Sequence, residues 1–216
     1  MEKSHLISIA DHFAFSGTCI SFDVITAGHI NCTYLVTCDD FSMSSRYILQ
    51  KINTTVFSDP VGVMKNINAV TNYIRSKLSD PQAKERRCLR VIPTRSSDLV
   101  YCDRDTSYWR AYKFINNTCN YEHARDNGIA YRFGRAVGLF QQQLSDFPSA
   151  TLTETIPDFH NMRARYEQLE TALKYTQSQR ASEVKQEIDY LMGEKERGSQ
   201  IWDLWISGEL PSRVTH

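Results

Sequence analysis

The sequence predicts an α+β fold in which an antiparallel sheet comes first and helices follow. Three short runs rich in β-branched and aromatic residues lie within residues 22–52 of the 216-residue chain, and the links between them are short. Short links of this kind join neighbouring antiparallel strands. Beyond residue 120 the apolar residues recur at helical spacing instead. The composition changes between the two parts at the polar stretch 116–120.

The three predicted strands form an antiparallel meander. They are Phe22–Thr26, Thr33–Cys38 and Arg46–Ile52. A polar turn over residues 39–45 joins the second strand to the third, and residues 27–31, Ala-Gly-His-Ile-Asn, join the first to the second.

A helix is predicted from Pro60, because Ser-Asp-Pro is a start signal and apolar residues then recur at helical spacing to Leu78. Asp80-Pro81 is predicted to end it. Further strands are expected over residues 87–93, 99–102 and 108–115. In the last of these, alternation places one set of side chains on one face, namely Tyr108, Arg110, Tyr112 and Phe114.

The second part of the chain is predicted to be helical. Apolar stripes run over residues 129–144, 159–173 and 184–192, and the tail 208–216 resembles a turn entering a short strand. We therefore expect three regions: a sheet lobe over 1–115, a linker over 116–120 and a helical lobe over 121–216.

Composition excludes several classes of protein. The 25 basic and 25 acidic residues balance, so the chain lacks the field of a dedicated nucleic-acid binder. No signal-peptide core and no apolar run of membrane-spanning length are present, so no membrane partner is expected. The six cysteines contain no C-x-x-C pair and no zinc-ligand spacing, which indicates scattered reduced thiols in a cytoplasmic protein.

Two segments of the sheet could bind a nucleotide. The link between the first two strands holds Gly28, His29, Ile30 and Asn31, and a glycine-bearing turn can place backbone N–H groups over phosphates. A plain hairpin is the alternative. On the third strand, Gln50 and Lys51 point to opposite faces, so only one of them can meet the phosphates, and the pattern leaves both open.

A third candidate is the end of the last predicted strand. Phe114 and Ile115 lead into the linker, where a kinase would hold adenine by backbone hydrogen bonds. An ordinary interdomain linker is the alternative.

Three strings together resemble a known superfamily. They are residues 28–34, Gly-His-Ile-Asn-Cys-Thr-Tyr; residues 47–53, Tyr-Ile-Leu-Gln-Lys-Ile-Asn; and residues 156–161, Ile-Pro-Asp-Phe-His-Asn. The chain is similar through them to the aminoglycoside-phosphotransferase and choline-kinase-like superfamily, and most to its N-acetylhexosamine 1-kinase branch. The resemblance implies a protein-kinase-like fold, with residues 1–115 as the nucleotide-binding lobe, 116–120 as the hinge and 121–216 as an incomplete helical lobe. It also implies ATP and Mg²⁺ as cofactors, and transfer of phosphate to a sugar hydroxyl.

The resemblance also implies where the reaction residues lie. Residues 211–216 are similar to the lead-in of the family's H-x-D-x-x-x-x-N loop, with His216 as its opening histidine. The family's catalytic Asp and metal ligands follow that histidine, so no base or metal ligand is expected in this chain. We expect a truncated chain that is inactive alone. The predicted helix from Pro60 contains no Asp or Glu, which places the kinase Lys–Glu ion pair in doubt.

Two histidines are candidate acceptor contacts. His29 and His160 can each hydrogen-bond a sugar hydroxyl, although a turn histidine and a helix-start histidine are the alternatives. Aminoglycosides, choline, homoserine and methylthioribose are acceptors elsewhere in the superfamily. A nucleotide-binding remnant without turnover and a helical interaction protein are the other functional hypotheses.

Overall fold

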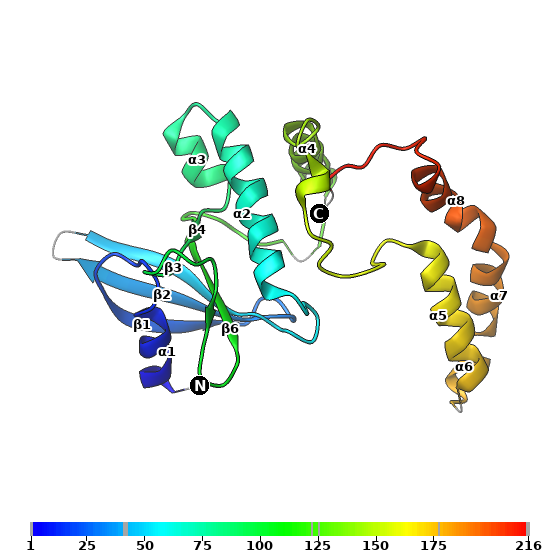
Figure 1. The fold of residues 1–216 in the computed structure, drawn as a ribbon, viewed down its shortest axis with the longest axis horizontal. Coiled ribbons are helices and arrows are strands. Elements are labelled where there is room, and N and C mark those ends of the chain that lie inside the picture. The colour runs from blue at the N-terminus through cyan, green and yellow to red at the C-terminus, as the bar shows by residue number, and fades with distance from the viewer. Residues whose placement is uncertain (1, 41–42, 122, 125, 177, 215–216) are drawn as a thin grey trace. The chain divides into compact units, whose positions relative to one another are not determined.

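The structure is a computed structural model that describes residues 2–40, 43–121, 123–124, 126–176 and 178–214. It divides into two compact units. The first unit is residues 1–155 with 213–216, and the second unit is residues 156–212. Figure 1 shows the helices and strands of each unit.

The described part of the first unit contains a six-stranded antiparallel sheet in the order β1-β2-β3-β6-β4, with β5 paired to β6. The strands are β1 Thr18–Ile25, β2 Cys32–Asp40, β3 Met43–Lys51, β4 Val91–Ile92, β5 Tyr101–Cys102 and β6 Tyr108–Lys113. The predicted meander is confirmed, since β1, β2 and β3 lie side by side (Figure 1). The predicted α+β class is confirmed with it.

One face of the sheet, the α1 side, packs against α1 (Lys3–Ala10) and the segment that follows it. Leu6, Ile9, Ala10 and Phe13 are buried there against Trp109. The sequence analysis did not predict α1. The spacing of its buried residues, i, i+3 and i+4, was the available signal.

The other face, the α2 side, packs against α2 (Pro60–Lys77). This helix begins where Ser-Asp-Pro predicts, and Asp59 Oδ1 caps it by accepting from the Gly62 N–H at 2.8 Å. Ile52, Met64 and Tyr112 form the buried centre of the α2 side.

Three expectations about the elements were incomplete or wrong. Helix α2 does end before Asp80-Pro81, as predicted, but the expectation missed a second helix, α3 (Pro81–Arg87), which Asp80 starts by accepting from the backbone N–H groups of Gln82 and Ala83. Strands β4 and β5 are two residues each, shorter than predicted. Residues 211–214 form no strand; Val214 is instead buried against Ile74 in a small cluster of the first unit.

Helix α4 (Asn127–Gln143) and the short 3₁₀ turn η1 (Ser149–Thr151) complete the first unit. Only part of the predicted apolar stripe of α4 packs against other residues. Phe140 packs with buried Leu144 at its C-terminal end, whereas Phe133 is 71% exposed.

The second unit is helical, as predicted, and contains α5 Met162–Tyr175, α6 Arg180–Glu183, α7 Lys185–Gly193 and α8 Lys195–Ile206. Arg163 of α5 makes a bidentate ion pair with Asp203 of α8, at 2.7 and 2.6 Å. Lys195 and Glu170 add a second link at 2.6 Å. The division into compact units falls after residue 155, not at residues 116–120. The lobe boundary at 116–120 concerns a different division of the chain and stays a prediction.

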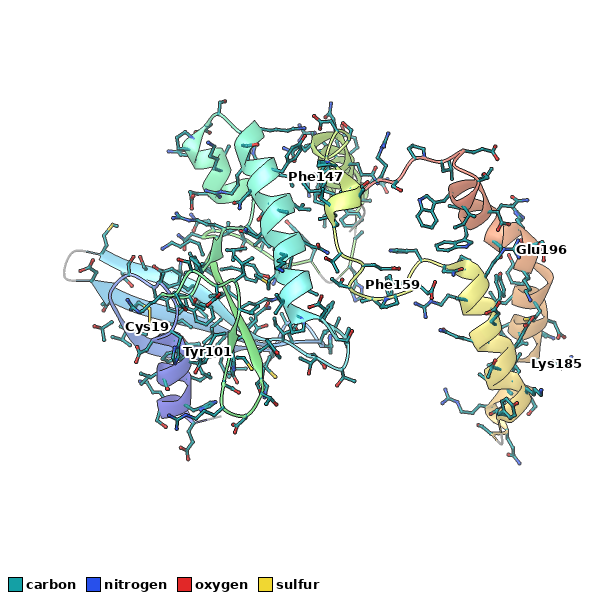
Figure 2. All side chains as sticks on the ribbon, in the orientation of Figure 1. Cys19, Tyr101, Phe147, Phe159, Lys185 and Glu196 are labelled. Carbon is teal, nitrogen blue, oxygen red and sulfur yellow. A yellow bond between two sulfur atoms is a disulfide. The ribbon has the colours of Figure 1, made fainter. Side chains whose placement is uncertain are left out.

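The expectation that the cysteines are scattered reduced thiols was wrong for two of them. Cys19 of β1 and Cys38 of β2 lie directly opposite each other and form a disulfide (Figure 2). The pairing follows from the register of β1 and β2, which a sequence spacing of 19 residues does not reveal. Among the described residues, no helix is long and apolar enough to span a bilayer.

Candidate functional site

A row of polar side chains crosses the α2 side of the sheet. Thr33 of β2, Gln50 of β3 and Arg110 of β6 are direct partners in the strand register. Gln50 Nε2 donates to Thr33 Oγ1 at 2.9 Å, and Arg110 Nε donates to Gln50 Oε1 at 2.9 Å. We call these three residues the polar row. The central amide thereby links the hydroxyl to the guanidinium.

Arg110 is buried, with only 8% of the residue's surface exposed. Its Nη1 lies 3.9 Å from Met64 Sδ of α2, and its guanidinium carbon lies 5.4 Å from the centre of the Tyr112 ring. Among the described residues, no carboxylate lies within ion-pair distance of it. Helix α2 contributes a thioether at this point, as expected from its lack of Asp and Glu.

The strand register and the buried residues show on which face of the sheet Gln50 and Lys51 each lie. Tyr47 and Leu49 are buried on the α1 side, and side chains alternate along a strand, so Lys51 belongs to that face. Ile52 is buried on the α2 side, which places Gln50 there. Lys51 lies opposite Trp109, a residue of the α1-side core.

The loop over residues 26–31 is next to the polar row, because Thr33 follows it by two residues. Gly28 has a backbone φ of +106°, a conformation that glycine adopts without strain. Asn31 Oδ1 accepts from the Asn53 N–H at 3.0 Å, which ties the loop to the segment after β3. His29 and Ile30 are exposed.

A second row on the same face is apolar. Leu35, Ile48 and Tyr112 are register partners one step further along the same three strands, and we call them the apolar row. Two residues along a strand span about 7 Å, so the two rows are neighbours. Leu35 and Ile48 are only partly buried.

The predicted hinge follows the apolar row. The Phe114 N–H donates to Arg46 O at 3.1 Å, and the Arg46 guanidinium carbon lies 4.6 Å from the centre of the Phe114 ring. Arg46 also contacts the side chain of Asn116. Ile115 is half-buried, and its carbonyl accepts from Thr118 Oγ1 at 3.4 Å.

The other candidates lie elsewhere. His160 belongs to the second unit, where it is exposed and makes an edge contact with Phe159 (labelled in Figure 2) at 4.9 Å between ring centres. The proposed opening histidine of the catalytic loop, His216, lies outside the described residues. In the part of the chain that the structure describes, no group of three or more His, Cys, Asp or Glu side chains could hold a metal ion.

The site contains one residue that the sequence analysis placed on a face but did not consider as a ligand. Arg110 lies on the same face of β6 as Tyr108 and Tyr112, and Gln50 of β3 lies on this face of the sheet too. The available signal was a charged residue among aromatic residues, in a strand that is expected to be covered on both faces. Its lack of an acidic partner could be seen only in the structure.

No protein-family model matches the chain. Among solved structures, the chain is similar to spectinomycin phosphotransferase, APH(9)-Ia, in a complex with ADP and spectinomycin. The sequence identity is 15% and the TM-score is 0.39. The similarity covers 77% of this chain and 46% of that one, so this chain spans less than half of the other protein's length.

Proposed function

We propose that the first unit binds ATP on the α2 side of its sheet, and that the intact protein transfers the γ-phosphate to a sugar hydroxyl. The observation that carries this proposal is the pair of neighbouring rows on one face. A nucleotide needs apolar surface for its base and hydrogen-bond donors for its phosphates. The partly exposed Leu35 and Ile48 of the apolar row offer the first, and the polar row with the loop around Gly28 offers the second.

The strand register supports one direction for the proposed nucleotide. Arg110 and Tyr112 follow one another on one face of β6, and Phe114 comes directly after the strand, so the phosphates would lie at Arg110 and the base toward Phe114 and Ile115. Gln50 and the loop residues Gly28 to Asn31 would then meet the phosphates. Lys51, on the α1 side, would not.

The reaction in the proposal is phosphoryl transfer. The acceptor oxygen attacks the γ-phosphorus, the bond to the β,γ-bridging oxygen breaks, ADP leaves, and the hydroxyl proton passes to a carboxylate. In the proposal, that carboxylate belongs to the H-x-D-x-x-x-x-N loop of the family that the chain resembles. The described residues do not fit a Mg²⁺ site, so Mg²⁺ enters only through the resemblance.

The acceptor in the proposal is an N-acetylhexosamine, on the strength of the three strings that resemble that branch. His29 and His160 are the proposed acceptor contacts in this chain, and the zero net charge favours a small-molecule partner over nucleic acid. A cytoplasmic location belongs to the proposal because ATP is the donor. The Cys19–Cys38 disulfide is the observation that counts against it.

Thermal unfolding with added nucleotides tests the binding. A ligand of the native state at 100 times its Kd stabilises by about 2.7 kcal/mol, so ATP should raise the midpoint of this chain in a dose-dependent way. Adenosine should raise it less, because it lacks the phosphates. An unchanged midpoint at millimolar ATP would contradict the proposal.

Product analysis of the intact protein tests the transfer. We expect ADP and a sugar phosphate from N-acetylglucosamine or N-acetylgalactosamine, and neither from choline or an aminoglycoside. ATP binding without transfer to any acceptor would favour the nucleotide-binding remnant instead.

A further inference from the structure

A buried guanidinium without an acidic partner is costly for a protein. Removing a charge from water carries a penalty of several kcal/mol, which neighbouring opposite charges normally offset. Two other arginines of this chain contact an acid closely: Arg75 lies 2.7 Å from Glu85, and Arg163 lies 2.6 Å from Asp203. Arg110 is more buried than either, yet its described neighbours are an amide, a thioether and a phenol ring.

We propose that Arg110, with Gln50 and Thr33, forms the site for the terminal phosphates of the nucleotide. The missing counter-charge is then the ligand itself. This inference rests on the proposed function for the identity of the ligand. It moves the phosphate-binding cation from the third strand, where the sequence analysis expected it, to β6.

The hydrogen bonds of the polar row suit this role. The Nε–H bond to Gln50 fixes the plane of the guanidinium, and Thr33 holds the amide of Gln50 in turn. A guanidinium has further N–H donors in a fixed fork that matches phosphate oxygens. Because α2 presents Met64 rather than an acid, no carboxylate of that helix competes for those donors.

The row is also accessible from one end. Thr33 and Gln50 are only half-buried, and Thr33 lies two residues after Asn31, at the edge of the exposed loop that holds Gly28. A phosphate entering beneath this loop would reach Thr33 and Gln50 first and the guanidinium next.

Gln50→Glu is the most informative variant. The new carboxylate occupies nearly the same volume, keeps an acceptor for the Arg110 Nε–H and supplies the missing counter-charge. The variant should therefore fold, with a raised melting midpoint, and bind ATP and inorganic tripolyphosphate at least tenfold more weakly, as expected when a charge-assisted contact is lost. Adenosine affinity should not change. Gln82→Glu, on exposed α3, is the control with the same change of charge.

Calorimetric titration of ATP, adenosine and tripolyphosphate into the unaltered chain, Gln50→Glu, Arg110→Gln and Gln82→Glu separates the outcomes. Loss of ATP and tripolyphosphate binding in the first two variants, with adenosine affinity kept, supports the phosphate site. Equal ATP affinity in the unaltered chain and Gln50→Glu overturns it while the proposed function stands. Tripolyphosphate binding that Gln50→Glu abolishes, with no binding of ATP or adenosine, keeps the anion site and overturns the proposed function.

Discussion

Among single side chains of the first unit, Asp103 is a buried carboxylate that organises the turn between β5 and β6. Its Oδ2 accepts from Trp109 Nε1 at 2.8 Å, and its Oδ1 accepts from the N–H groups of Ser107 and Asp105 at 2.8 and 3.0 Å. Burial raises the pKa of Asp103, but these hydrogen bonds outweigh burial, so that its pKa is lowered overall. The ionised form is therefore stabilised by folding.

Asp103→Asn should lower the free energy of unfolding at pH 7 by about 1–3 kcal/mol, because an amide N–H₂ would face the donors that the carboxylate now accepts from. A group with a lowered folded-state pKa adds stability above its unfolded pKa of about 3.9, and that stability disappears as the pH falls through the folded value. The difference between the variant and the unaltered chain should thus shrink below pH 4.

Urea unfolding at pH 7 and at pH 3 measures this difference. Asp105→Asn, at an exposed neighbouring position, is the matched control and should change stability little. A loss for Asp103→Asn that is the same at both pH values would contradict the account of the carboxylate.

Lys51→Gln tests the assignment of faces on β3. Because Lys51 shares the α1 side with Leu49, the substitution should leave the Kd for ATP within about twofold, since a group outside the phosphate site contributes no charge-assisted contact. Calorimetric titration checks this. A tenfold weakening would return the phosphate-binding role to the strand-3 lysine.

The sequence indicated Gln50 as a phosphate candidate but not Arg110, for one physical reason. Alternation in a strand assigns side chains to faces, but it does not show which face of β3 shares a layer with which face of β6. That depends on the pairing of Gln50 with Arg110, which joins residues 60 apart in the chain. Among the described residues, no carboxylate lies within ion-pair distance of Arg110, because α2, which lies between β3 and β6 in the chain, places Met64 there.

At the level of elements, α2 and α3 begin with the same Asp-Pro signal but differ in how much they bury. Helix α2 buries residues along its length, including Val63, Met64 and Ile74, whereas none of the residues of α3 is buried. From the sequence, the first Asp-Pro is predicted to start a helix and the second to end one. The same capping chemistry operates at both, with the Asp side chain accepting from backbone N–H groups.

Asp59→Ala should therefore cost about 1 kcal/mol of unfolding free energy, the usual loss for an N-cap, because α2 is part of the core. Asp80→Ala is the matched control and should cost less, since α3 can fray without exposing buried residues. Urea unfolding of both variants provides the comparison. An equal or larger loss for Asp80→Ala would contradict the packing described for α2.

Strands with strong alternation were the most predictable elements, and short ones were the least. β2 and β6 appear within a few residues of their predicted ranges, because β-branched and aromatic residues alternate across a face that is buried. β4 and β5 have two residues each, and their pairing with β6 depends on the register of the sheet rather than on their own sequence.

For the whole molecule, the division of the chain into units could not be predicted from composition. The change from strand-rich to helix-rich sequence is at residues 116–120, yet α4 lies in the first unit together with the sheet. Phe140 and Leu144 pack near Ile74 and Cys88, contacts between segments more than 50 residues apart that no local pattern shows.

The disulfide makes a prediction about the covalent state of the whole chain. Denatured chain without reductant should show four reactive thiols, those of Cys32, Cys88, Cys102 and Cys119, and six after reduction. Reduction of the folded protein should also lower its stability by about 3 kcal/mol, the usual effect of opening a loop of this length. Thiol titration and urea unfolding measure the two effects. Six thiols before reduction would contradict the paired state.

Photolabelling with 8-azido-ATP tests the central claim most directly, because it locates the base of the bound nucleotide. We predict that the modified peptides come from β2, β3 and residues 108–115, around the apolar row of Leu35 and Ile48, and that excess ATP suppresses the labelling. Modification confined to residues 156–212, or labelling that excess ATP does not suppress, would contradict a nucleotide site on the α2 side of the sheet.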